Sequence, residues 1–263
     1  MKAGSFAAWA GALAAACLLA MPAGVAQAAD VNVMISGGFS AAYGALGADF
    51  ERTTGHRLLT VKGPSMGTTA EAIPNRLSRG EPADVLIMVG SALDGLARQG
   101  AVVAGSQVEL ARSTIGMAVR AGAPRPDIST VDAFKRTLLE AKSIAYSDSA
   151  SGVYVSTQLY QRLGIADQVK PKSRMIPAEP VAAVVARGEA EIGFQQISEL
   201  LPVPGIDYVG PLPPALQHVT IFSAGIAAGA RRPEAARALL EFLTAPAAAA
   251  AIAKTGLEPI TAK

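Results

Sequence analysis

The sequence predicts an α/β protein of two lobes, in which helices flank mixed, mostly parallel sheets. One observation is the stretch at residues 76–89, where an amphipathic segment ends at Gly80 and the apolar run 85–89 follows a turn that contains proline. This pattern is typical of a helix that leads into a buried parallel strand. A similar stretch recurs at residues 184–194, with an apolar helix, a basic residue, Gly-Glu and an acidic residue before a strand. Two such units predict two similar lobes that clasp a ligand.

The first 29 residues are expected to be a cleaved export signal rather than part of the fold. Lys2 is basic, residues 6–21 are apolar, and residues 26–28 read Ala-Gln-Ala, the small-residue pattern of a signal peptidase site. The alternative is a lipid anchor on Cys17. The sequence favours it less, because the apolar run continues past Cys17 and a better cleavage site lies downstream.

The composition argues against two classes of protein. Of the 23 Lys and Arg residues, removal of Lys2 leaves 22, against 21 Asp and Glu. A nearly neutral chain without a basic block is not expected to bind nucleic acid. After the signal no apolar run reaches about 18 residues, so no membrane insertion is expected after cleavage. Cys17 is the only cysteine, so the exported chain lacks disulfides and its roughly 235 residues must be stabilised by their core.

Strands and helices alternate in the first half of the chain. The predicted strands are residues 31–35, 58–61 and 85–89, which are apolar or β-branched. In the first helix, Tyr43, Leu46 and Phe50 recur at spacings of three and four residues. Gly55 follows as a C-terminal capping glycine, and two further helices are expected to end near Arg79 and at Gly100.

The second half continues this alternation without a linker. The predicted strands are residues 115–119, 143–146, 191–194 and 219–224. The predicted helices are residues 131–141, a segment around Leu159 that stops at Gly164, residues 181–186 and residues 233–243. Thr130 is expected to cap the first of these helices.

Three loops rich in Ser, Thr and Gly separate a predicted strand from a predicted helix. They are residues 36–40, 65–69 and 147–152. A helix start presents unpaired N–H groups and the positive end of its dipole, which suits an anion. For any single loop the alternative is that its hydroxyls are ordinary N-caps. Three such loops at successive strand ends, where open α/β sheets bind ligands, predict one site for a compact anion.

Further motifs resemble the periplasmic molybdate-binding proteins of ABC importers. Residues 79–85 read Arg-Gly-Glu-Pro-Ala-Asp-Val, and residues 151–154 read Ser-Gly-Val-Tyr. Residues 185–193 and the Leu-Leu-Glu-Phe-Leu-Thr-Ala-Pro stretch at 239–246 also match, so the resemblance covers essentially the whole chain after the signal. It implies the type II periplasmic binding protein fold, with two crossover strands and a ligand in the cleft between the lobes. It also implies a periplasmic monomer that delivers its ligand to an ABC permease.

On this basis the lobe borders are predicted near the crossover segments. Residues 30–112 and 223–263 are expected to form the first lobe, and residues 113–222 the second. Such lobes close on their ligand by hinge motion.

Departures from the family pattern change the expected ligand. Gly38 stands where the family has a ligand serine, and Gln196 replaces a family tyrosine. Arg112, next to Ser113, adds a guanidinium group, which favours planar carboxylates through paired hydrogen bonds; the alternative is a surface or hinge ion pair. We therefore expect an organic polycarboxylate ahead of molybdate. The predicted ligand-binding residues are Gly38, Ser40, Ser65, Thr68, Arg112, Ser113, Ser151, Tyr154 and Gln196.

A second function, from a different class, stays open. One branch that resembles this family in fold is the periplasmic aconitate isomerases, which shift an allylic proton in a tricarboxylate. That chemistry needs clamped carboxylates and a positioned base, for which Tyr154, His218 and Glu179 are the candidates. The other histidine, His56, follows Gly55 in a turn and is expected to be exposed. No metal-ligand spacing, nucleotide-binding loop or nucleophile motif occurs, so no metal or cofactor is predicted. The sequence favours a transport receptor over an isomerase, because it contains clear candidate binding loops but no clear catalytic base.

Overall fold

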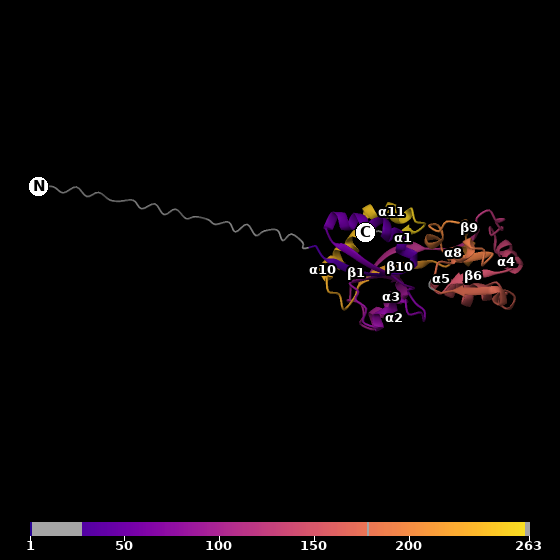
Figure 1. Ribbon diagram of the computed structural model, residues 1–263, viewed down its shortest axis with the longest axis horizontal. Coiled ribbons are helices and arrows are strands. Elements are labelled where there is room, and N and C mark those ends of the chain that lie inside the picture. The colour runs from indigo at the N-terminus through magenta and orange to yellow at the C-terminus, as the bar shows by residue number, and fades with distance from the viewer. Residues whose placement is uncertain (2–27, 178, 261–263) are drawn as a thin grey trace.

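The computed structural model describes residue 1, residues 28–177 and residues 179–260. It forms two α/β lobes that lie side by side (Figure 1). Most of the predicted export signal, including Cys17, lies outside the described residues.

A six-stranded mixed sheet forms the centre of one lobe. Its order is β11-β4-β10-β3-β1-β2, in which β3 and β2 run parallel to β1 on either side, and β10 runs antiparallel to β3 and β4. The strands are β1 (Asp30–Ile35), β2 (Arg57–Lys62), β3 (Val85–Val89), β4 (Val108–Ser113), β10 (Thr220–Ile226) and β11 (Glu258–Pro259). All five residues of β3 are buried, as a central strand covered on both faces requires.

The other lobe is built on a five-stranded mixed sheet of order β7-β6-β8-β5-β9. β6 runs parallel to β7 and β8, whereas β5 runs antiparallel to β8 and β9. The strands are β5 (Ile115–Arg120), β6 (Ile144–Ser147), β7 (Ser173–Ile176), β8 (Ile192–Gln196) and β9 (Ile206–Pro211). The chain passes between the sheets at residues 113–115 and returns at residues 211–220. The predicted lobe borders stay a proposal.

Helices flank both sheets. The first lobe has α1 (Gly37–Thr54), α2 (Ile73–Ser78), α3 (Gly90–Arg98), α10 (Pro233–Thr244) and α11 (Ala249–Ala253). The second has α4 (Val131–Glu140), α5 (Ala150–Tyr154), a π-helical turn (Val155–Leu159), α6 (Tyr160–Arg162), α7 (Ala166–Val169), α8 (Val181–Ala186) and α9 (Ile197–Leu200). Short 3₁₀ turns occupy Lys170–Lys172, Pro214–Leu216 and Pro246–Ala248. Each lobe has its own apolar core, with Phe39 and Phe50 buried in one and Phe134 packed edge-on against Phe194 in the other.

The predicted strands and helices occur in the structure, with two kinds of difference. Strands β4, β7, β9 and β11 were not predicted; β7 and β9 are sheet edges that carry polar residues and lack a continuous apolar run. The predicted loop at 36–40 is mostly helix, because α1 begins at Gly37. The expected exposure of His56 is wrong: its side chain is buried, accepts a hydrogen bond from the Ala29 amide at 3.2 Å and packs on Phe50.

Among the described residues, no single helix is long and apolar enough to cross a membrane, although the pair Pro233–Thr244 and Pro246–Ala253, bent by 58°, passes the same test on length and composition.

The start of α4 allows a first test of the structure. Thr130 caps this helix as predicted, since its hydroxyl oxygen accepts a hydrogen bond from the Ala133 amide at 3.1 Å. We expect Thr130→Ala to lower the free energy of unfolding by about 1 kcal/mol. Thr130→Ser keeps the capping hydroxyl and should retain most of the stability that the cap contributes. Urea denaturation of the two variants measures the difference. Equal loss in both would show that the hydroxyl does not act as a cap.

Candidate functional site

Buried polar side chains join the two lobes where the chain crosses between them. Ser113 donates a hydrogen bond to Gln196 Oε1 at 2.7 Å, and Gln196 Nε2 donates to Thr220 Oγ1 at 3.0 Å. Gln217 pairs with Ile115 through two bonds, as it accepts from the amide at 2.9 Å and donates to the carbonyl at 3.0 Å. The predicted site residues Ser113 and Gln196 thus meet, but at the hinge.

A hollow of about 220 Å³ lies between the lobes at the strand ends. The first lobe contributes residues that follow β1 and β2, and the second contributes residues at β6, β8, α8 and α9. The lining residues are Gly37, Lys62, Gly63, Pro64, Glu71, Ser147, Asp148, Ser149, Glu179, Pro180, Gln195 and Glu199. All three predicted loops therefore lie at or beside this hollow, as expected for an open α/β sheet.

The charged side chains around the hollow are mostly acidic. Lys62 supplies a positive charge, whereas Glu71, Asp148, Glu179 and Glu199 supply carboxyl groups. Within residues 28–177 and 179–260, no group of three or more His, Cys, Asp or Glu residues is arranged to hold a metal ion.

The ionisation of Glu199 is altered by its surroundings. Burial raises its pKa to about 7, a hydrogen bond with the Gln195 side chain opposes the shift, and the charge of Asp148 adds to it. Its carboxyl group lies against Gly37, the first residue of α1, so closely that a Cβ atom on Gly37 would overlap it. Next to it, the Ser198 hydroxyl donates to the Gly38 carbonyl at 2.6 Å and ties α9 to α1 across the lobes.

The hydroxyls that precede two helices at the hollow are not helix caps. Ser36 precedes α1 and Ser149 precedes α5, and neither side chain makes a capping hydrogen bond. Ser36 Oγ is buried and has no hydrogen-bond partner among the described residues. Such a group lowers stability unless a ligand or a local movement satisfies it.

Most of the predicted ligand residues make contacts other than those expected. Gly38 packs so closely under Phe222 that a Cβ atom would overlap the ring. Ser40 donates to the Ser36 carbonyl at 3.1 Å, and Ser65 accepts from the Val89 amide at 3.0 Å. Thr68 is exposed. Ser151 shares a hydrogen bond with Ser147 at 3.0 Å, and only Ser147 of this pair lines the hollow.

Arg112 lies at an exposed edge of the first sheet and not at the hollow. Its guanidinium group bonds to Glu258 on β11 at 3.0 Å, and its side chain is 45% exposed. This is the ion pair that was the alternative for this residue. Arg112 therefore does not support an organic acid as the ligand.

The three candidate bases fall into two places. Tyr154 donates to the Leu216 carbonyl at 2.6 Å, accepts from Arg162 at 2.8 Å and stacks on His218 with 4.7 Å between ring centroids. Neither ring lines the hollow, and burial lowers the pKa of His218. Glu179 does line the hollow, but Arg187 holds its carboxylate with two contacts of 3.1 and 3.2 Å.

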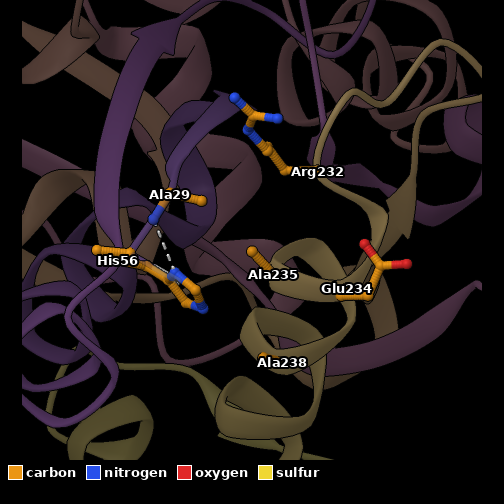
Figure 2. Close-up of a pocket in the computed structure, with 7 residues that line it drawn as sticks. Ala29, His56, Arg232, Glu234, Ala235 and Ala238 are labelled. Atoms are coloured by element: carbon orange, nitrogen blue, oxygen red, sulfur yellow. Dashed lines mark hydrogen bonds between the residues drawn. The ribbon is translucent and has the colours of Figure 1, made fainter. Parts of the chain in front are cut away.

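A second hollow, of about 560 Å³, lies in the first lobe beside α10 (Figure 2). His56, Arg232 and Glu234 line it together with alanines, and the dashed line marks the bond from Ala29 to His56. It is larger, but only one lobe contributes to it. We place the functional site between the lobes.

Comparison with known proteins shows the family of the chain. Residues 31–258 match the model of the family described as bacterial extracellular solute-binding protein. The chain belongs to this family. The predicted resemblance to molybdate-binding proteins and the two-lobed fold are thereby confirmed.

Three relatives of this solute-binding protein are informative. A Pseudomonas sp. protein named aconitate isomerase is 52% identical over 253 residues, covering 96% of this chain and 97% of the relative. The molybdate-binding protein ModA of Azotobacter vinelandii is 27% identical over 247 residues, covering 88% and 90%. The solved structure of the Azotobacter vinelandii periplasmic molybdate-binding protein superposes with a TM-score of 0.70 at 19% identity, covering 89% of this chain and 100% of that one.

Sequence reasoning missed several residues of the hollow in this solute-binding protein. They are Gly37, Lys62, Glu71, Asp148, Gln195 and Glu199. Asp148 lies inside one of the three predicted loops, and Lys62 directly follows the predicted strand at residues 58–61. For Glu199, the available signal was an acidic residue three positions after the end of β8, at the edge where ligands bind.

Proposed function

We propose that this protein is an aconitate isomerase, which interconverts cis- and trans-aconitate by moving an allylic proton. The observation that carries the proposal is the 52% identity to the Pseudomonas sp. aconitate isomerase over nearly the full length of both chains. This reverses the preference for a receptor that the sequence alone had favoured.

The site between the lobes is compatible with a small polyacid. The first turn of α1 offers unpaired amides, Ser36 holds an unpartnered hydroxyl next to it, and Lys62 supplies a positive charge. The acidic side chains of the hollow oppose a trianion. Binding is therefore favourable only with proton uptake or a change in lobe orientation, and hinge motion is the common way such lobes admit a ligand.

A transport receptor for a small anion, an organic polycarboxylate or an oxyanion, is the second candidate. It is supported by the family itself and by the identity of 27% to the molybdate-binding protein ModA. In that case the protein binds its ligand in the periplasm, passes it unchanged to an ABC permease, and residues 1–29 direct export.

Incubation with trans-aconitate in deuterated water tests the choice between the two functions. We expect conversion to cis-aconitate, with deuterium entering the allylic position of product and recovered substrate, because the abstracted proton can exchange with solvent. NMR spectroscopy follows both. Internal return of the proton lowers the incorporation but not the conversion, so conversion is the deciding signal.

Calorimetry on the same preparation provides the control. Aconitate that binds tightly but is neither converted nor labelled over hours would contradict the isomerase and support the receptor. Binding of molybdate or sulfate with no binding of either aconitate would contradict a polycarboxylate ligand altogether.

A further inference from the structure

Glu199 belongs to the second lobe and lies against the start of α1 in the first lobe. It lies on α9, one short step after β8, and α9 is held against α1 by the bond from Ser198 to the Gly38 carbonyl. The carboxyl group of Glu199 fills the space that a side chain on Gly37 would take. Glycine at position 37 therefore leaves room for this carboxyl group at the start of α1.

The carboxyl group combines burial with access to the hollow. Glu199 is partly buried and is one of the lining residues. Gln195, the neutral residue that bonds to it, is itself buried and fixed, because its Oε1 atom accepts from the Val181 amide at 2.9 Å. The charged groups that share the hollow are Lys62, Glu71, Asp148 and Glu179.

We infer that Glu199 is the catalytic base of the allylic proton shift, an inference that rests on the proposed isomerase function. The ionised carboxylate takes the proton from the methylene carbon of aconitate. The electron pair of that C–H bond forms a new double bond to the central carbon. The electron pair of the old double bond then takes up the proton that Glu199 returns, at the carbon at the other end of the allylic system. Bonds and protons balance without another reactant, and Glu199 ends ionised.

The ionisation of Glu199 suits both halves of this cycle. With a pKa raised to about 7, the group is partly ionised at neutral pH, so it accepts a proton and returns it readily. The other candidates are occupied: Tyr154 bonds to Leu216 and Arg162, His218 stacks on Tyr154, and Glu179 is held by Arg187.

The deciding variant is Glu199→Gln, which keeps the size of the side chain and removes the base. We expect turnover to fall about 10²–10⁴-fold. Trans-aconitate should still bind, at least as tightly as to the wild type, because the amides of α1 and Lys62 are unaltered and one opposing carboxylate is removed. Glu199→Asp, which shifts the carboxylate but keeps it, should retain more turnover than Glu199→Gln. The matched control is Glu140→Gln, at the exposed end of α4, which should equal the wild type.

The pH profile gives a readout that a structural role would not change. For the wild type, kcat/KM should fall as the pH drops below about 7, because protonation removes the base. The residual activity of Glu199→Gln should lack this step. Circular dichroism and thermal melting establish whether the variant is folded. If it is not, Glu199→Asp provides the test, because its kcat/KM should keep a pH-dependent step that lies at a different pH from that of the wild type.

The outcomes separate this inference from the proposed function. Wild-type protein that does not convert aconitate contradicts the isomerase itself. An active wild type with an equally active Glu199→Gln overturns the assignment of the base alone. Loss of turnover in Glu179→Gln or Asp148→Asn, with Glu199→Gln still active, would place the base at those residues instead.

Discussion

Asp84→Ala is expected to lower the free energy of unfolding by about 3 kcal/mol or more. The carboxylate is buried, with 1% of Asp84 exposed. One oxygen accepts from the Asn32 amide at 2.8 Å and its side chain at 2.9 Å, and the other accepts from the amides of Arg231 and Arg232 at 2.6 and 3.0 Å. Alanine leaves three backbone donors unpaired in a partly buried place, and an unpaired donor there costs about 1 kcal/mol, the lower end of the range for buried groups.

The effect should depend on pH in a direction that follows from these bonds. Burial alone would raise the pKa of Asp84, but the bonds from Asn32 and then from Arg231 and Arg232 outweigh it and hold the pKa below its ordinary value. A depressed pKa gives stability that is present above the unfolded-state value, about 3.9, and is lost as the pH falls through the folded-state value. The difference between wild type and Asp84→Ala should therefore shrink in acid.

Urea denaturation at neutral pH and at several pH values below 4 measures this difference. Asp94→Ala is the matched control, since Asp94 is exposed on α3 and bonds only to the Gln107 side chain at 3.0 Å among the contacts of the described residues. It should change stability by no more than about 0.5 kcal/mol. Equal losses in the two variants, or a difference that does not depend on pH, would contradict the role of the four bonds.

Asp84 also illustrates how far the sequence was informative. The apolar run after it and the helix before it predicted β3 and α2, because burial on both faces of a parallel strand leaves a continuous hydrophobic signature. The sequence also shows an acidic residue, Asp84, directly before this strand. Its partners at residues 231 and 232, nearly 150 positions later, were not, since a side chain that bonds to backbone amides imposes no requirement on residue type.

The same limit, that sequence patterns report local structure and not distant partners, explains which residues of the candidate site were predicted. The three segments rich in Ser, Thr and Gly do lie at or beside the hollow, because small and hydroxyl residues at strand ends are a local pattern, although residues 37–40 are helix rather than loop. Individual predicted residues differ from the lining residues by one or two positions, as Gln196 at the end of β8 does from Gln195. In a strand, neighbouring side chains point to opposite faces, so a shift of one residue exchanges the hollow for the hinge. The pairing of Arg112 with Glu258 depends on a distant strand and has no local signature.

Gly152→Ala should be the most disruptive single-methyl substitution at the hollow. A Cβ atom at position 152 would overlap the Ser147 carbonyl oxygen and lie 2.6 Å from its carbon, and both belong to the backbone. The start of α5 must then move away from the end of β6, which strains the Ser147–Ser151 hydrogen bond. Overpacking of this kind costs about 1–3 kcal/mol. Because Asp148 and Ser149 connect the two segments and line the hollow, ligand affinity should fall together with stability.

Gly44→Ala is the control that separates the added methyl group from its location. Gly44 lies on the exposed face of α1, and a Cβ atom there meets no other atom within 4 Å. Alanine in an open helix position should stabilise the protein by about 0.5–1 kcal/mol, because it restricts the unfolded chain more than glycine does. Denaturant midpoints should therefore move in opposite directions, and calorimetry with trans-aconitate should show weaker binding for Gly152→Ala alone. If Gly152→Ala matched Gly44→Ala in both measurements, the close approach of α5 to β6 would not be required for either stability or binding.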